Sequence, residues 1–262
     1  MVDQEYLRLR IDEAANAVQN TEIRDWQTPY SGKLSQAVDH TLLKTDATQT
    51  QIDALCGEAK QHEFKAVCVR LKWVHQAVRN LQSSSVVVAC VVGFHEGTYA
   101  TAQKVAEAAG AIEAGATEID MVIKHALLKQ NRLVDVFHDV EAVRKAASSQ
   151  FVLKVILETS ELTDADIVAG CVIAQLAGAD FVKTSTGFTS HGATVEHVRL
   201  MKAVVGERLG VKASGGVRTL DHCKAMISAG AHRIGTSNGV SIVDASSIVQ
   251  SPGIDQAEGT AY

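Results

Sequence analysis

Short runs of β-branched and other apolar residues alternate with longer, Ala-rich stretches from Leu34 onward. The short runs predict eight strands, near 34–43, 65–70, 85–93, 117–123, 151–158, 180–185, 210–214 and 232–236. The longer stretches have apolar residues at helical spacing and predict eight helices, near 49–63, 72–81, 98–114, 131–148, 163–177, 194–207, 219–229 and 238–249. Because successive parallel strands need a crossover connection, this alternation indicates a parallel sheet.

An internal repeat supports this count of elements. The tripeptide Ala-Gly-Ala begins at Ala114, Ala177 and Ala229, each time between a predicted helix and the next strand. A glycine at that point can adopt the left-handed conformation that ends a helix. Eight strand–helix units, with no G-x-G-x-x-G after the first strand, favour a closed (β/α)8 barrel, or TIM barrel, over an open dinucleotide-binding sheet.

The two ends of the chain differ from this barrel, which we assign to residues 34–250. Residues 1–33 are polar and helix-prone up to about Arg24, so we expect a helical N-terminal extension. It would cover the lower face of the barrel or take part in an oligomer contact. Residues 251–262 begin with Ser-Pro-Gly and continue with polar residues, which predicts a flexible C-terminal tail.

Composition narrows the class of protein. With 46% hydrophobic residues the 262-residue chain is neither disordered nor collagen-like, and a net charge of -5 with 5% aromatic residues argues against nucleic-acid binding and acidic membrane surfaces. Five widely spaced cysteines without C-x-x-C fit a reducing compartment. The longest apolar run, 86–92, is too short to cross a bilayer, and residues 1–20 lack the apolar segment of a signal peptide. We therefore expect a cytoplasmic protein.

Charged residues interrupt several of the predicted strands. Side chains alternate between the two faces of a strand, so if the apolar positions 119, 121 and 123 face the helices, Glu118 and Asp120 point into the barrel. The same alternation places charged side chains inside the barrel on the next three predicted strands. They are Lys154 and Glu158 on the strand near 151–158, Lys183 on the strand near 180–185, and Lys212 on the strand near 210–214. These charges could form an ion-pair network that only fixes the barrel. Because buried charges are costly, we favour a functional cluster.

A lysine cluster in a desolvated site has a specific chemical use. Burial and a second ammonium both disfavour the charged form of a lysine, so its pKa falls below the usual value of about 10.4. The neutral amine can attack a carbonyl and form a Schiff base. Glycines also follow the last three strands, at Gly187, Gly215, Gly216 and Gly235, where barrels commonly bind phosphate through backbone N–H groups. Ordinary turns would explain one such glycine, but the set points to a phosphorylated sugar.

Five segments make this pattern more specific. They are 39–44 (DHTLLK), 118–123 (EIDMVI), 153–159 (LKVILET), 181–188 (FVKTSTGF) and 211–219 (VKASGGVRT). From about Leu34 to its C-terminus, the chain resembles the 2-deoxyribose-5-phosphate aldolase family of class I aldolases. The resemblance implies reversible cleavage of 2-deoxy-D-ribose 5-phosphate to D-glyceraldehyde 3-phosphate and acetaldehyde, in deoxyribonucleoside catabolism, with no cofactor and no metal.

The resemblance also implies roles for single residues. Lys183 matches the Schiff-base lysine, Lys212 the lysine that lowers its pKa, and Asp120 the carboxylate that relays protons through water. Tyr262 resembles a terminal tyrosine that some members fold into the site to protonate the enamine, with a simply disordered tail as the alternative. The residues matching substrate-binding positions are Asp39, Thr41, Cys68, Lys154, Thr184 and Thr186. Those matching phosphate-binding positions are Gly187, Gly215, Gly216, Arg218, Gly235 and Ser237.

Some of these assignments have alternatives. Cys68 could be only a small buried hydrophobe. Phe188 stands where one branch of the family has a lysine, so a cation for the phosphate must come from elsewhere, with Arg218 as a candidate. The chain could also be a different Schiff-base aldolase, or a non-catalytic sensor of sugar phosphates. We expect no metal site, because H-E-x-x-H is absent, and by analogy we expect a homodimer.

Overall fold

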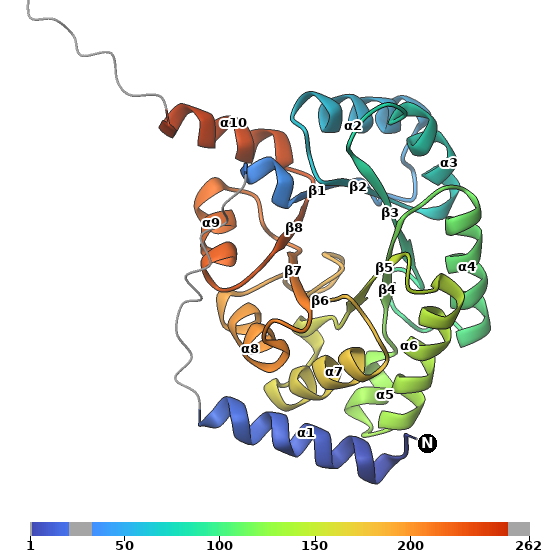
Figure 1. The fold of residues 1–262 in the computed structure, drawn as a ribbon. Helices are drawn as coiled ribbons and strands as arrows, with labels where there is room; N and C mark the ends of the chain where they lie inside the picture. Colours follow the sequence, from blue (N-terminus) through green and yellow to red (C-terminus); the bar gives the residue numbers. More distant parts are fainter. Residues whose placement is uncertain (1, 21–32, 251–262) are drawn as a thin grey trace, which may run out of the picture.

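The computed structural model describes residues 2–20 and 33–250 and contains a closed barrel of eight parallel strands (Figure 1). The strands are β1 (Val38–Thr41), β2 (Ala66–Val69), β3 (Val87–Val92), β4 (Glu118–Val122), β5 (Val152–Ile156), β6 (Phe181–Lys183), β7 (Gly210–Ser214) and β8 (Arg233–Thr236). Each strand pairs with the next in the chain, and β8 pairs with β1. The predicted (β/α)8 barrel is therefore confirmed.

Helices surround the strands and follow the predicted positions closely. They are α2 (Gln49–Gln61), α3 (Leu71–Asn80), α4 (Thr101–Glu113), α5 (His125–Lys129), α6 (Leu133–Ala147), α7 (Asp164–Leu176), α8 (Val195–Val205), α9 (Leu220–Ser228) and α10 (Gly239–Gln250). Threonine side chains accept a backbone N–H at the start of four of them: α2, α7, α8 and α9. No helix in the described part of the chain is long and apolar enough to cross a membrane.

Two details differ from the predicted elements. The first strand was expected from residue 34, but Leu34–Ala37 forms the 3₁₀ helix η1, and only Val38–Thr41 pairs with its neighbours. The five-residue helix α5 was not expected, because it is too short to show helical periodicity. The repeated glycines behave as predicted. Gly115, Gly178 and Gly230 have φ of 100°, 82° and 107° and follow α4, α7 and α9.

The apolar core consists of two parts. The larger part lies between the strands and the helices and includes Ile119, Met121 and Val155, whose side chains point away from the barrel axis. A smaller inner apolar cluster fills the other face of β2 to β5, and its members are Leu43, Cys68, Ala89, Val91, Phe94, Val122 and Ile156. The alternation expected for β4 and β5 is thus observed. On β4 and β5 the charged residues Asp120 and Lys154 share the inner face with apolar members of this cluster, Val122 and Ile156.

The N-terminal helix α1 (Gln4–Gln19) packs on the outer surface of α6, α7 and α8 (Figure 1). Asp3 caps it by accepting the Tyr6 N–H at 2.8 Å, and Leu7 is fully buried against the helical layer. The helix therefore lies beside the ring of helices and does not cover the lower face of the barrel. The domain boundaries at 33/34 and 250/251 stay predictions, and Tyr262 lies outside the described residues.

Candidate active site

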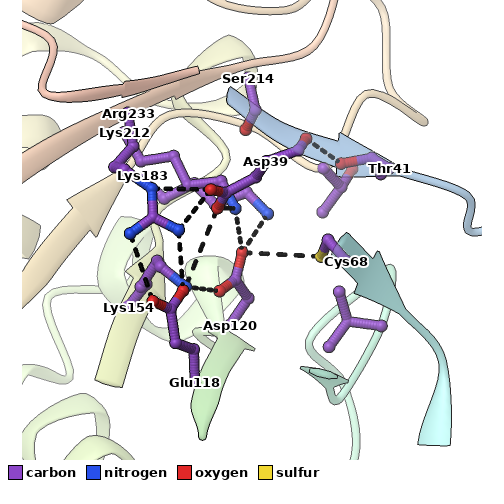
Figure 2. Close-up of polar contacts among 12 residues, drawn as sticks. Asp39, Thr41, Cys68, Glu118, Asp120, Lys154, Lys183, Lys212, Ser214 and Arg233 are labelled. Carbon is purple, nitrogen blue, oxygen red and sulfur yellow. Dashed lines mark hydrogen bonds and ion pairs between the residues drawn. The ribbon is translucent and has the colours of Figure 1, made fainter. Parts of the chain in front are cut away.

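The inner charges of β4 to β7 meet around one carboxylate, Asp120 (Figure 2). Sheet register places Asp120 beside Lys154 and Lys183 beside Lys212. The Asp120 carboxylate accepts hydrogen bonds from Lys154 Nζ at 2.7 Å, Lys183 Nζ at 2.8 Å and Lys212 Nζ at 2.7 Å. All four side chains are at least 96% buried. The strand alternation thus correctly predicts a cluster of three lysines with a carboxylate.

The pKa values of the three lysines shift in different directions. Burial lowers the pKa of Lys183; Asp120 opposes this, while the Lys212 ammonium adds to it, and the net shift is downward. Burial acts on Lys212 in the same direction, but Asp120 and Asp39 outweigh it and raise the pKa of Lys212. The pKa of Lys154 is raised too, because Asp120 and Glu118 outweigh its burial. Lys183 is therefore the one of these three lysines that most readily supplies a neutral amine.

Asp120 itself stays ionised. Burial alone would raise its pKa, but the neighbouring ammonium groups of Lys154, Lys183 and Lys212 hold that pKa well below the usual value. An ionised carboxylate within hydrogen-bond distance of a neutral amine is suited to accept and return protons.

A second set of contacts below the lysines was not predicted. The Arg233 guanidinium on β8 donates from Nε to Asp39 at 2.7 Å and from a terminal nitrogen to Glu118 at 3.0 Å. Asp39 also accepts a short hydrogen bond from Lys212, so Arg233 and Lys212 share it. Arg233 is the first residue of β8. It lies two positions before Gly235, so its side chain points into the barrel on the same face of the strand. The alternation that identified Lys212 would have identified Arg233 as well.

We expect Arg233→Leu to destabilise the protein strongly. The substitution removes one partner of a buried ion network and leaves Asp39 and Glu118 undercompensated, which typically costs about 3–5 kcal/mol. Urea unfolding followed by circular dichroism measures the loss. Arg132→Leu is the matched control, because Arg132 pairs with Asp135 at the surface and should change stability by about 0–1 kcal/mol. Equal effects of the two substitutions would contradict a structural role for the buried network.

Thr41 and Cys68 lie at the edge of this cluster. Thr41 Oγ1 donates to the Asp39 backbone carbonyl at 2.9 Å. Cys68 is fully buried in the inner apolar cluster, with Sγ 4.0 Å from Asp120. Burial raises the pKa of the Cys68 thiol, and Asp120 raises it further. Cys68 therefore stays a protonated thiol beside the lysine cluster, which fits the interpretation of an inert small hydrophobe.

Glu158 does not join the lysines, contrary to the alternation inferred for its strand. β5 ends at Ile156, and Glu158 has a left-handed backbone with φ of 61°, so the strand parity no longer applies to it. Its buried carboxylate accepts hydrogen bonds from the Thr186 N–H at 3.2 Å, the Thr186 hydroxyl and the Thr189 hydroxyl. Glu158 thus holds the loop after β6, which includes Gly187.

Glu158→Gln should weaken binding of phosphorylated substrate about tenfold, seen as a higher KM, because an amide cannot accept all three hydrogen bonds. Attack of the lysine amine on acetaldehyde, which has no phosphate, should be unchanged. Steady-state kinetics and borohydride trapping measure the two effects. Glu161→Gln, in the 3₁₀ helix η2 (Thr159–Glu161), is the control. An unchanged KM in Glu158→Gln would contradict this role for the loop.

A cavity of about 250 Å³ opens at the carboxyl ends of the strands. Lys183 is the member of the buried charged cluster that lines it, while Asp120, Lys154 and Lys212 lie beneath. All six predicted phosphate-binding residues line the cavity, with Thr41 and Thr186: Gly187, Gly215, Gly216, Arg218, Gly235 and Ser237. Thr184 does not line it, and instead its hydroxyl donates to the Ser214 carbonyl at 2.9 Å and links β6 to β7.

At two positions of the cavity, a side chain larger than that of glycine would collide with its neighbours. Gly215 has φ of 85°, and a Cβ there would lie 2.9 Å from the Gly192 Cα. A Cβ on Gly235 would lie 2.8 Å from the Ser214 Cβ and 3.0 Å from the Lys212 side chain, so a larger residue would press on both. The glycines therefore allow the loops to approach one another and leave backbone groups at the cavity surface. The helix α10 begins nearby, at Gly239, with Ser237 and Asn238 in the wall.

The charged cluster is not arranged as a metal centre. Among residues 2–20 and 33–250, no group of three or more His, Cys, Asp or Glu side chains could hold a metal ion. The carboxylates of the cluster are occupied by lysine and arginine partners. What the site offers is a buried amine with a lowered pKa, an ionised carboxylate beside it, and a cavity with glycine-rich loops.

Comparison with known proteins agrees with this chemistry. Residues 33–245 match the family described as DeoC/LacD family aldolase. The chain is 52% identical over 222 residues to a deoxyribose-phosphate aldolase of Coccidioides immitis, covering 84% of this chain and 83% of that protein. A crystal structure from Coccidioides immitis superposes with a TM-score of 0.89 at 47% identity, covering 94% of this chain and 98% of that chain. The tetrameric deoxyribose phosphate aldolase of Aeropyrum pernix superposes with a TM-score of 0.76 at 30% identity, covering 92% and 98%.

Proposed function

The chain belongs to the DeoC/LacD family of aldolases, and we propose that it cleaves 2-deoxy-D-ribose 5-phosphate reversibly to D-glyceraldehyde 3-phosphate and acetaldehyde. The observation that carries this proposal is Lys183. Of the three lysines around Asp120 it is the one with a lowered pKa, and it alone of the buried charged cluster lines the cavity. A neutral amine at the base of a cavity with glycine-rich loops fits Schiff-base chemistry on a phosphorylated sugar.

In this proposal the Lys183 amine adds to the C1 aldehyde carbon of the open-chain sugar to form a carbinolamine. Asp120, 2.8 Å from Lys183 Nζ, relays a proton through water to the departing hydroxyl, and loss of water gives the iminium. Lys212 keeps its proton and adds a positive charge that favours the neutral form of Lys183. Asp39 and Lys154 set the charge around Asp120. Thr41 and Thr186, which line the cavity, would contact the substrate, while Cys68 and Thr184 would support the site from behind its wall.

Carbon–carbon cleavage follows from the iminium. A base takes the proton of the C3 hydroxyl, and the C2–C3 bond breaks. C3 becomes the aldehyde carbon of D-glyceraldehyde 3-phosphate, which leaves. The electron pair of the broken bond moves toward the iminium nitrogen, so C1 and C2 remain on Lys183 as an enamine. Protonation of the enamine at C2 and hydrolysis release acetaldehyde.

The phosphate would lie against the loops that follow β6, β7 and β8. The backbone N–H groups of Gly187, Gly215, Gly216 and Gly235, with the hydroxyl of Ser237, are suited to bind its oxygens. Arg218 also lines the cavity and would supply a cation. Tyr262 would protonate the enamine if the C-terminal tail enters the site, but it lies outside the described residues.

Two measurements test the proposal. The purified protein should release acetaldehyde from 2-deoxyribose 5-phosphate, with much lower rates on fructose and ribose phosphates. Borohydride should inactivate it in the presence of acetaldehyde. A different sugar preference would favour another Schiff-base aldolase, and binding of sugar phosphate without borohydride inactivation would favour the non-catalytic sensor.

We also propose a homodimeric, cytoplasmic enzyme of deoxyribonucleoside catabolism. Buried, unpaired cysteines fit a reducing compartment, since all five in the chain are free and buried. The Aeropyrum pernix relative is a tetramer, so light scattering of the purified protein should distinguish a dimer from that assembly.

A further inference from the structure

The cavity is lined by cations and by no carboxylate. Lys44, Lys183 and Arg218 line it, and none of the described residues in its wall is Asp or Glu. Lys44 and Arg218 are exposed, in the loops after β1 and β7, whereas Lys183 is buried at the base. A cavity with this lining attracts an anion, and its two exposed cations belong to different loops.

The charge of a phosphate ester needs more than one of these cations. A phosphate monoester carries about −1.5 to −2 charges near neutral pH. In the proposed chemistry Lys183 attacks as a neutral amine, so it cannot balance that charge. Arg218 balances one charge, which leaves Lys44 as the remaining cation in the described cavity wall.

The loop carrying Lys44 is held in place on both sides of that residue. Arg70 Nε donates to the Leu43 carbonyl at 2.7 Å, and Lys72 Nζ donates to the Thr45 carbonyl at 2.9 Å. The Lys44 carbonyl accepts the Ala47 N–H at 3.3 Å, which closes the turn. Within residues 2–20 and 33–250, the Lys44 ammonium has no hydrogen-bond or ion-pair partner. The backbone of Lys44 is thus held in place, while its ammonium group is free to contact an anion in the cavity.

Phe188 leaves the loop after β6 without a cation at the cavity. It follows Gly187 in the loop after β6 and is 45% exposed, but its side chain has no donor for an anion. Its ring stacks on His95, with centroids 5.1 Å apart and an interplanar angle of 13°, and meets Phe94 edge-on. The Phe188 ring thus gives this side of the cavity shape and no positive charge.

We propose that the Lys44 ammonium binds the phosphate group of the substrate, with Arg218 as the second cation. This inference rests on the proposed function, since it assigns a ligand contact within the same cavity. Lys44 is then a specificity-determining residue that favours phosphorylated over unphosphorylated aldehydes.

The test compares Lys44→Gln, Lys44→Arg and the control Lys60→Gln, which removes an exposed lysine from the far end of α2. Lys44→Gln should lower kcat/KM for 2-deoxyribose 5-phosphate about 10- to 100-fold, mainly through KM, and raise the inhibition constant of inorganic phosphate about as much. Lys44→Arg should retain most of the affinity, because it keeps the charge. Borohydride trapping with acetaldehyde should be unchanged in all three variants.

Each other outcome has a distinct meaning. If Lys44→Gln leaves KM and phosphate inhibition unchanged, or lowers acetaldehyde trapping equally, the inference is overturned. If the wild-type protein does not cleave 2-deoxyribose 5-phosphate, the proposed function fails. Calorimetric binding of inorganic phosphate to the same variants then still decides whether Lys44 binds the anion.

Discussion

Lys183→Arg will abolish both cleavage of 2-deoxyribose 5-phosphate and acetaldehyde-dependent inactivation by borohydride. Arginine keeps an N–H donor for Asp120, to which Lys183 Nζ donates at 2.8 Å, so the carboxylate is not left without this partner. A guanidinium does not lose its proton in proteins and cannot add to an aldehyde, so no Schiff base forms. Activity should fall to the background of the assay.

Mass spectrometry locates the reaction on the chain. After reduction with acetaldehyde, the wild-type protein should carry an ethyl group on Lys183. Lys154→Arg is the matched control, because Lys154 is equally buried and also contacts Asp120 but has a raised pKa. This variant should still be labelled on Lys183. An ethyl group on Lys154 or Lys212 of the wild-type protein would refute the assignment.

The barrel was predictable because its strands separate apolar from charged positions. On β4, Ile119 and Met121 face the helices while Glu118 and Asp120 face inward, so sequence alternation alone gives the direction of each side chain. Helix ends were predictable where a local signal exists, as at Gly115. The helix α5 and the 3₁₀ helix at Leu34–Ala37 lack such a signal and were missed.

The site was predictable only as far as strand periodicity extends. Alternation identifies Lys183 and Lys212 because both lie within regular strands. It fails for Glu158, which lies beyond the end of β5, and it cannot reach Lys44, which lies in a loop. Arg233 was overlooked at the first position of its strand.

Protonation was predictable only in part. Burial and a neighbouring ammonium correctly predict a lowered pKa for Lys183. That Lys212 instead has a raised pKa depends on its contacts with Asp39 and Asp120, which come from opposite sides of the barrel. Lys212, Asp39 and Asp120 are far apart in the sequence, and they meet only because the strands close into a barrel.

Asp120→Asn should lower kcat by about 100- to 10,000-fold, the usual contribution of a general acid–base group. Asparagine keeps the shape of the side chain but cannot accept and return a proton. The Lys183 amine would remain, and removal of the Asp120 charge, which raises the pKa of Lys183, would favour its neutral form further. Borohydride trapping with acetaldehyde should therefore still reach completion on Lys183, although more slowly, because Asp120 also assists formation of the iminium. Exchange of the acetaldehyde methyl protons with deuterium, followed by NMR, should slow with kcat.

Glu118→Gln is the control that separates proton transfer from the general charge balance. Glu118 contacts Lys154 and Arg233 in the same buried cluster, but it makes no hydrogen bond to Lys183. Both substitutions remove one negative charge among buried cations, so both should lower the midpoint of thermal unfolding. The loss of methyl-proton exchange should be specific to Asp120→Asn. Equal loss of exchange in the two variants would mean that Asp120 acts through the stability of the cluster, and near-normal exchange in Asp120→Asn would exclude it as the proton relay.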